Sequence, residues 1–317
     1  MANYVKISTL GPEPPRVNPG TGQEAVDWMI DFWRKELKQV LPDRPDLIVV
    51  PEACDRFLAH SKEERLAYYR TRGNQVRDFF AKVARENHCY VAYSAAREMP
   101  DGTWRNSTQI IDRNGQVVGI YNKNHPVVTE TTEWGVLAGR EAPLIECDFG
   151  KVACVICFDL NFDELRLKYV EAKPDLLIFS SMYHGGFMQN YWAYTCRAHM
   201  VTAVAGARLP SAIISPVGTV IASSTSYFHY VTATVNLDCK VAHLDFNWEK
   251  LEALKNKYGP GVSIYAPDYV GVVLISSELE DVTADEMVQE FEIELLDDYW
   301  ARSLAHRHDP KNMEPPA

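Results

Sequence analysis

Short aliphatic and β-branched runs alternate along this chain with longer stretches in which apolar residues follow a helical period. Residues 47–50 (LIVV) form a continuous apolar run, which predicts a buried strand. Before this strand, apolar residues recur every three or four positions, at Val26, Ile30, Trp33, Leu37 and Leu41. Such an alternation of strands and amphipathic helices is typical of an α/β layered domain.

Two pairs of residues have the spacing of a helix capping box. Thr21 with Glu24 predicts the start of the helix that precedes the first strand. Ser61 with Glu64 repeats the pattern at the start of the amphipathic stretch 62–87. We therefore expect helical structure to begin at both places.

Three candidate strands follow, at residues 89–96, 107–113 and 116–122. The dipeptide Asn114-Gly115 separates the last two and favours the tight turn of a β-hairpin. Hairpin strands run antiparallel, so the sheet is predicted not to be purely parallel.

The next part of the chain predicts further strands and two helices. Two strand-like runs, 151–156 and 175–180, flank a helical segment over 163–171, and a helix is expected over 188–200. Four later runs indicate a meander of strands, at residues 202–207, 211–216, 219–224 and 231–237.

The character of the sequence changes after residue 245. No repeat or low-complexity linker interrupts the chain before that point, which predicts one domain over residues 1–245. We expect residues 246–317 to form a C-terminal extension that packs on the core or on a partner subunit. It contains a helix, a Gly-Pro-Gly loop, a strand over 270–276, an acidic helix near 284–298 and a disordered tail at 309–317.

Composition narrows the class of protein. Of 317 residues, 46% are hydrophobic and 24% charged, and the net charge of −11 argues against nucleic acid as a partner. The chain has neither a signal-peptide pattern nor an apolar run of the roughly 20 residues that a membrane helix needs, so we expect a cytoplasmic protein without membrane contact. Seven cysteines, an odd number, fit reduced thiols. The glycosylation sequon at Asn106 is then expected to stay unmodified and to form a polar turn before a strand.

The stretch KVACVICFDL places Cys154 and Cys157 in a C-x-x-C spacing. A redox pair of this spacing lies at the start of a helix, whereas here it lies in a β-branched run. Strand residues three apart point to opposite faces, and no second ligand pair for zinc occurs in the sequence. We therefore interpret Cys154 as a core residue. Cys157, where the apolar run ends, is either a second core thiol or a nucleophile at a strand end.

Two more polar groups follow strands directly. Glu52 comes after LIVVP, and Lys123 comes after the run 116–122. Together with Cys157 they would supply a general base, a cation for an oxyanion, and a nucleophile whose thiol pKa the cation would lower. The alternative for Glu52 and Lys123 is that each is a solvated surface residue.

A Cys-His arrangement is a second possibility for the nucleophile. It would need a histidine close to Cys157, and three lie near candidate strand ends or the helix that follows them, at His125, His184 and His199. The sequence contains no Walker loop, dinucleotide-binding glycine motif, G-x-S-x-G or H-E-x-x-H. Nucleotide-binding, serine-hydrolase and zincin functions therefore lack support.

Three motifs in this order resemble the nitrilase, or carbon–nitrogen hydrolase, superfamily: LIVVPE at Glu52, YNKNHPVVTE at Lys123 and VICFDLNFDELR at Cys157. The resemblance implies an α/β fold built as a four-layer α-β-β-α sandwich, and a Glu-Lys-Cys triad of these residues. It implies that Lys123 and the backbone N–H of Phe158 stabilise the oxyanion. It also implies a homodimer or higher homo-oligomer that needs no metal or organic cofactor.

The resemblance suggests a second glutamate after the lysine. Glu130 matches it by position, and Glu133 is a nearby competitor that we interpret as a loop residue. The loop 181–192 should border the pocket, and from it we take Tyr183 as a candidate contact with substrate.

The chain also departs from the family pattern. Nitrilases usually have Cys-Trp-Glu at the nucleophile, whereas Cys157 is followed by Phe158 and Asp159, which favours a small linear amide as substrate. Many N-carbamoyl amino acid hydrolases carry an arginine shortly after the cysteine. Leu160-Asn161 stands there, so a carboxylate on the substrate loses its expected partner. Nitrile hydrolysis, N-carbamoyl hydrolysis, a transferase-like or catalytically silent protein, and a thiol–disulfide protein remain alternatives.

Overall fold

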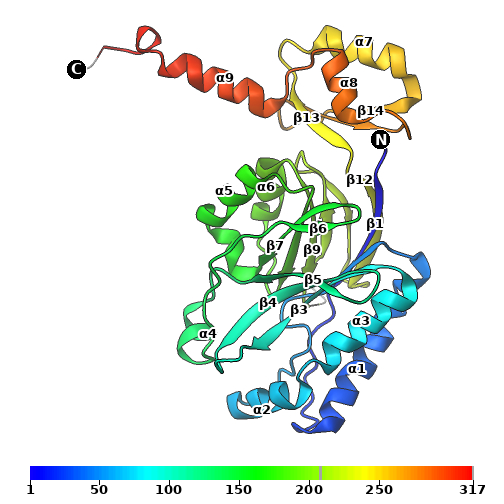
Figure 1. The fold of residues 1–317 in the computed structure, drawn as a ribbon, viewed down its shortest axis with the longest axis vertical. Coiled ribbons are helices and arrows are strands. Elements are labelled where there is room, and N and C mark those ends of the chain that lie inside the picture. Colours follow the sequence, from blue (N-terminus) through cyan, green and yellow to red (C-terminus); the bar gives the residue numbers. More distant parts are fainter. Residues whose placement is uncertain (207–208, 316–317) are drawn as a thin grey trace. The chain divides into compact units, whose positions relative to one another are not determined.

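The computed structural model describes residues 1–206 and 209–315, and the chain divides into two compact units. The main unit comprises Val5–Val235, and the C-terminal unit comprises Met1–Tyr4 with Asn236–Ala317 (Figure 1). The domain boundary expected near residue 245 stays a prediction.

The main unit contains the first of two six-stranded sheets. Its strands, in spatial order, are β12 (Tyr230–Asn236), β1 (Tyr4–Leu10), β2 (Leu47–Val49), β3 (Tyr90–Glu98), β4 (Trp104–Ile111) and β5 (Val117–Asn122). β1, β2 and β3 are parallel, whereas β4 and β5 form the antiparallel hairpin predicted at Asn114-Gly115. Gly115 has a φ of 76°, which glycine adopts without strain. The expectation of a mixed sheet is confirmed.

The second sheet repeats this arrangement. Its strands, in spatial order, are β11 (Val220–Ser223), β10 (Ala212–Ile214), β9 (His199–Val204), β8 (Leu176–Ser181), β7 (Gly150–Ile156) and β6 (Ile145–Cys147). β7, β8 and β9 are parallel, and the outer strands on both sides are antiparallel.

Helices cover the outer face of each sheet, and the inner faces pack together (Figure 1). The covering helices are α1 (Gln23–Leu37), α2 (Lys62–Arg72) and α3 (Gln75–Asn87) on one side, and α5 (Asp163–Ala172) and α6 (Phe187–Cys196) on the other. Thr9 Oγ1 donates to the Thr202 carbonyl at 2.8 Å and Ser180 Oγ donates to the Val50 carbonyl at 2.9 Å, which joins the sheets. The four-layer α-β-β-α sandwich is thus confirmed.

Two helix predictions need correction. The stretch 62–87 is two helices rather than one, because Gly73 ends α2 with a φ of 48°. Its Ser61–Glu64 capping box is present, with the Glu64 N–H donating to Ser61 Oγ. Thr21 forms no capping box, since α1 starts one residue later with Gly22 as its N-cap.

Strand predictions also need correction. The helix expected over 188–200 ends at Cys196, and residues from His199 already form β9. The expected meander is real for β9, β10 and β11, but β12 crosses to the other sheet and lies beside β1. The strand expected at 202–207 ends at Val204, and residue 207 lies outside the described residues. Strand β1 itself was not predicted.

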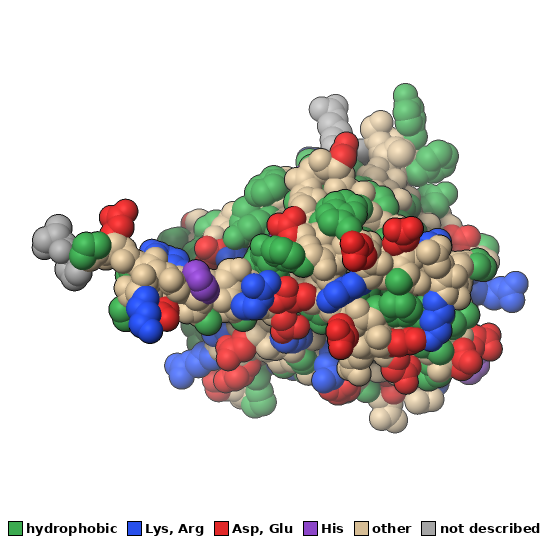
Figure 2. Space-filling model, turned by 90° about the horizontal axis from the view of Figure 1, so that it is seen from above, with side chains coloured by type: hydrophobic (Ala, Val, Ile, Leu, Met, Phe, Trp, Pro, Cys, Tyr) green, Lys and Arg blue, Asp and Glu red, His purple; other side chains and the backbone are tan. Residues whose placement is uncertain are grey.

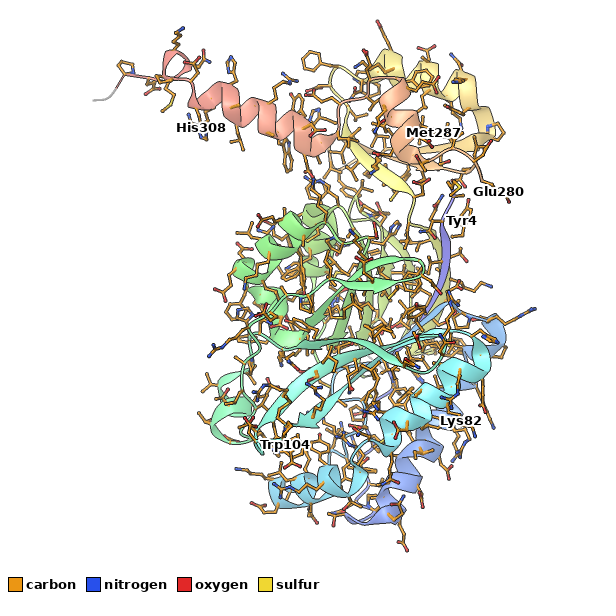
Figure 3. The ribbon with its side chains drawn as sticks, viewed as in Figure 1. Tyr4, Lys82, Trp104, Glu280, Met287 and His308 are labelled. Carbon is orange, nitrogen blue, oxygen red and sulfur yellow. The ribbon has the colours of Figure 1, made fainter. Side chains whose placement is uncertain are left out.

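The C-terminal unit has its own small core. A three-stranded antiparallel sheet is formed by β13 (Cys239–His243), β15 (Val272–Ser277) and β14 (Val262–Tyr265), together with the helices α7 (Trp248–Tyr258) and α8 (Ala284–Glu290). Met287 of α8, marked in Figure 3, is fully buried in this core.

The predicted acidic helix is wrong in its extent, because α8 ends at Glu290 and a separate helix α9 (Leu296–His308) follows. Only Leu296 of α9 is buried, and Figure 3 marks His308 at its far end. The predicted tail contains a 3₁₀ turn at Pro310–Asn312, and its last two residues lie outside the described part of the chain.

Charged side chains of both signs are interspersed with apolar ones on the face seen in Figure 2. Across residues 1–206 and 209–315, no helix has the length and apolar character required to cross a membrane.

Candidate active site

One pocket of about 290 Å³ brings together the residues that the sequence analysis singled out at three strand ends. Glu52 follows β2, Lys123 follows β5 and Cys157 follows β7, and all three line this pocket. Glu130 lines it too, from α4 (Val128–Thr132). The carboxyl ends of strands from both sheets therefore meet at one place, as open α/β sheets commonly arrange their sites.

Lys123 lies between two carboxylates. Its Nζ donates to Glu52 Oε1 at 2.8 Å and to Glu130 Oε2 at 2.7 Å, and the side chain is only 2% exposed. Burial by itself lowers the pKa of the ammonium, but Glu52, the Cys157 sulfur and Glu130 outweigh it and raise that pKa above its ordinary value. Lys123 is therefore a fixed cation at neutral pH.

Asn106 was missed as a site residue. It lies within β4, not in a turn as the sequence suggested, and its side-chain amide donates to Glu52 Oε1 at 2.7 Å and to Glu130 Oε1 at 2.9 Å. Asn106 is buried, and within the described part of the chain its Oδ1 has no hydrogen-bond partner. The place of β4 between β3 and β5 in the sheet brings this amide beside the carboxylates, so no sequence motif marked it.

The loop that carries Glu52 is anchored at Cys54, through both its carbonyl and its N–H. The Trp33 indole N–H donates to the Cys54 carbonyl at 3.0 Å, and the Cys54 N–H donates to the Ser94 carbonyl of β3 at 3.0 Å. Ala53, which lies between Glu52 and Cys54, has a φ of 46°, a left-handed conformation that residues other than glycine rarely adopt. These anchors direct the Glu52 carboxylate inward, where it is 4% exposed.

Cys157 has a left-handed backbone with a φ of 51°, at the sharp turn between β7 and the 3₁₀ helix Cys157–Asn161. Such strain is commonly kept where it presents a reactive side chain. Burial, and then the Glu52 carboxylate, raise the pKa of the thiol to about 12, although Lys123 and the Met182 backbone N–H lower it. Lys123 thus lowers the pKa of the thiol as expected, but burial and Glu52 outweigh it, and the resting sulfur is a neutral thiol beside a carboxylate.

The two cysteines of the C-x-x-C spacing have different surroundings. Cys154 is fully buried in β7, whereas Cys157 opens into the pocket. Cys154 and Cys157 are both free thiols. The interpretation of Cys154 as a core residue agrees with this placement.

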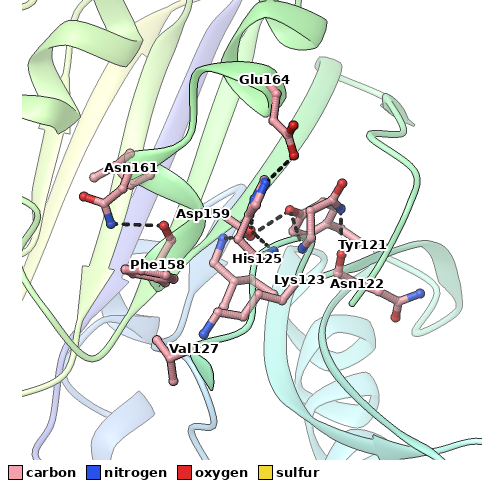
Figure 4. Close-up of polar contacts among 12 residues, drawn as sticks. Tyr121, Asn122, Lys123, His125, Val127, Phe158, Asp159, Asn161 and Glu164 are labelled. Atoms are coloured by element: carbon pink, nitrogen blue, oxygen red, sulfur yellow. Dashed lines mark hydrogen bonds and ion pairs between the residues drawn. The ribbon is translucent and has the colours of Figure 1, made fainter. Parts of the chain in front are cut away.

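Asp159 ties the nucleophile turn to the segment around Lys123. Its carboxylate is fully buried and accepts from the Ile156 N–H at 3.0 Å, from the Tyr121 hydroxyl at 2.7 Å and from the His125 N–H at 2.7 Å. The His125 ring bridges Asp159 and Glu164, at 3.1 and 2.7 Å (Figure 4). This network fixes Cys157 and Lys123 relative to each other.

His125 should make stability depend on pH. Its hydrogen bond with Asp159, helped by Glu164, raises the pKa of the ring although burial opposes this. A raised folded-state pKa stabilises the protein below the unfolded value of about 6.5, and this stabilisation is lost as the pH rises through the folded-state pKa. We expect His125→Gln to lower the free energy of unfolding at pH 6 and to have less effect at pH 9, as measured by urea unfolding. An equal effect at both pH values would contradict this assignment.

The remaining predicted site residues lie as follows. Phe158 carries its backbone N–H in the first turn of the 3₁₀ helix. The Tyr183 hydroxyl accepts from Asn161 at 3.0 Å, and Tyr183 is not among the residues that line the pocket. Glu133 is exposed at the end of α4.

The Cys-His alternative finds no support in the geometry. Among the described residues no histidine lines the pocket, and His199 is buried within β9. Nor are three acidic, histidine or cysteine side chains grouped to hold a metal ion anywhere in residues 1–206 and 209–315.

The sequence of this chain is similar to sequences of known proteins. The sequence model described as "Carbon-nitrogen hydrolase" matches residues 29–242, about two thirds of the chain. A formamidase of Bradyrhizobium sp. is 29% identical over 187 residues, which cover 57% of this chain and 52% of that protein. A deaminated glutathione amidase of Rattus norvegicus is 25% identical over 208 residues, covering 56% and 62%. The matched part thus spans little more than half of these relatives.

Solved structures show the same fold. Saccharomyces cerevisiae Nit3, a member of branch 10 of the nitrilase superfamily, has a TM-score of 0.61 at 14% identity, over 81% of this chain and 95% of that one. An amidase from Nesterenkonia sp. has a TM-score of 0.60 at 13% identity, over 80% and 96%. At such identities the likeness concerns the fold alone.

Proposed function

Because this chain belongs to the carbon–nitrogen hydrolase family, we propose that it hydrolyses a small linear amide through a thioester on Cys157. One observation carries the proposal: a neutral thiol, a buried carboxylate and a buried cation share one pocket, with Lys123 Nζ 2.8 Å from Glu52 Oε1. These are the groups that nucleophilic acyl transfer requires. The relatives named as formamidase and deaminated glutathione amidase act on amides by name and support the same class.

Acylation begins with a proton transfer. Glu52 takes the proton of the Cys157 thiol, and the sulfur attacks the amide carbon. The carbonyl oxygen becomes an oxyanion, which Lys123 and the Phe158 N–H stabilise. Glu52 returns the proton to the nitrogen, the C–N bond breaks, and ammonia or an amine leaves while the acyl group stays on sulfur.

Deacylation reverses the proton path with water. Glu52 takes a proton from a water molecule, whose oxygen attacks the thioester carbon, and the C–S bond breaks. The proton returns to the Cys157 sulfur, and the acid product leaves. Glu130 assists by fixing the Lys123 ammonium, to which it lies at 2.7 Å, and it shares Asn106 with Glu52. The homo-oligomer and the cytoplasmic location stay predictions.

Ammonia release from a substrate panel tests the proposed reaction. The panel contains aliphatic primary amides, N-carbamoyl amino acids and nitriles. We expect turnover of amides, with an acid and ammonia formed in equal amounts. Turnover of nitriles alone, or ammonia release without formation of the acid, would contradict hydrolysis of an amide as the main activity.

A further inference from the structure

The pocket contains two arginines that the proposed reaction does not use. Arg56 lies in the loop after β2, four residues beyond Glu52, and Arg65 lies on α2. Both side chains line the same cavity as the Cys157 sulfur. They come from a part of the chain that the nucleophile motif does not include.

Neither arginine has an acidic partner among the residues that the structure describes. The Nε atom of each is buried and has no hydrogen-bond partner there. The Arg65 guanidinium lies over the Trp134 ring, 4.3 Å from its centroid, which holds it in place without neutralising it. Burial lowers the pKa of Arg65, and the nearby charge of Arg56 lowers it further.

The rest of the main unit treats a buried arginine differently. Arg72, which is 4% exposed, donates to Asp55 at 2.6 Å and to the Ala96 carbonyl at 2.7 Å. In the pocket, the two carboxylates of Glu52 and Glu130 already bind Lys123. Arg56 and Arg65, both half-buried, therefore remain as cationic groups whose Nε atoms have no partner among the described residues.

We propose, on the basis of the proposed function, that Arg56 and Arg65 bind a carboxylate on the acyl part of the amide substrate. Guanidinium groups match a carboxylate by paired hydrogen bonds. The pair would take the place of the arginine that is absent after Cys157, where Leu160-Asn161 stands.

Binding by two arginines favours a carboxylate on the acyl part of the substrate over one on the amine part. The amine must leave before water attacks the thioester, and binding it at two cations would delay its release. An anchored acyl group, by contrast, stays aligned through both steps. Ala96, Val127 and Val136 supply apolar walls for a short methylene spacer. The volume of about 290 Å³ lies at the lower end of the range for small-molecule pockets.

A matched substrate pair tests this inference. Succinamate and 4-methylpentanamide have the same number and branching of heavy atoms, but only succinamate ends in a carboxylate. We expect kcat/KM to be roughly 10- to 100-fold higher for succinamate, as charge-assisted hydrogen bonds would give. Arg56→Gln and Arg65→Gln should each lower this ratio about tenfold or more, mainly through KM, and Arg65→Lys should restore part of it.

Arg97→Gln is the matched control. Arg97 is a half-buried arginine of β3 whose Nε also lacks a partner among the described residues, but it does not line the pocket. We expect this variant to keep the substrate ratio. A loss of the ratio in Arg97→Gln equal to that in Arg65→Gln would overturn the assignment.

Calorimetric titration of Cys157→Ala with each of the two amides distinguishes a failure of the carboxylate site from a failure of the proposed amide hydrolysis. Tighter binding of succinamate than of 4-methylpentanamide, without turnover by the unmodified enzyme, would support the carboxylate site and contradict amide hydrolysis. Turnover of both amides with equal kcat/KM would leave hydrolysis standing and overturn the carboxylate site. Equal or absent binding of both would overturn the carboxylate site regardless of turnover.

Discussion

Replacing Cys157 by alanine is expected to lower kcat/KM for a primary amide by about 10⁴-fold or more, to the detection limit of an ammonia assay. The pocket would keep Glu52, Lys123 and their hydrogen bonds, but it would have no atom to form the acyl-enzyme. The side chain is small, so urea unfolding should show a nearly unchanged stability.

Cys154→Ala is the matched control for this loss. Cys154 lies three residues earlier on the same strand and is fully buried away from the pocket. The control should retain most of the activity while losing some stability to the small cavity. Equal loss of activity in both variants would point to a paired role of the two thiols and contradict a single nucleophile.

Replacing Glu52 by glutamine is expected to lower kcat/KM by about 10²- to 10⁴-fold and, at the same time, to make the Cys157 thiol more acidic. Burial, and then the Glu52 charge and its hydrogen bond, raise the thiol pKa to about 12, against the lowering effect of Lys123. Glutamine removes the charge and leaves the cation. The variant should therefore hold more thiolate near pH 9 than the unmodified protein, yet turn over less substrate.

Thiolate absorbance near 240 nm measures this shift, with the matching Cys157→Ala variant subtracted at each pH. Glu130→Gln is the control, since Glu130 contacts the same Lys123 but is not among the leading causes of the shift in the Cys157 pKa. It should change the thiol pKa less than Glu52→Gln does. Glu52→Gln with full activity, or with an unmoved thiol pKa, would contradict the role of Glu52 as the base that takes the thiol proton.

The sequence predicted the parts of the site that lie at strand ends. An apolar run that stops at a polar residue marks the carboxyl end of a strand. Glu52, Lys123 and Cys157 could therefore be placed at strand ends from local pattern alone. Their meeting in one pocket depends on how two sheets stack, and only the family resemblance indicated it.

Residues in the middle of an element gave no such mark. Asn106 was interpreted as a polar turn at a sequon, whereas its contact with Glu52 follows from the place of β4 in the sheet beside β3. By local pattern, Arg65 resembles a surface residue of an amphipathic helix. Its position over Trp134 depends on packing between α2 and the segment after Lys123, which local pattern does not show. Charge alone could not predict which of the many arginines enters the pocket.

The incorrect predictions of helices and strands have similar causes. Residues 188–200 follow a helical period through His199. However, β9 starts at His199, because this residue pairs with Leu176 at the start of β8. β12 has the pattern of a fourth meander strand, yet its partner is β1, at the other end of the main unit. Long-range pairing overrides local pattern at both places.

The most direct test of the account is the mass of the Cys157 peptide after rapid acid quenching during turnover of a primary amide. We predict a mass increase equal to the acyl group minus one hydrogen, on the peptide that contains Cys157, and its disappearance when hydroxylamine is added before digestion. No acyl adduct on Cys157 under conditions where turnover is under way, with Cys157→Ala still releasing ammonia, would contradict the thioester mechanism.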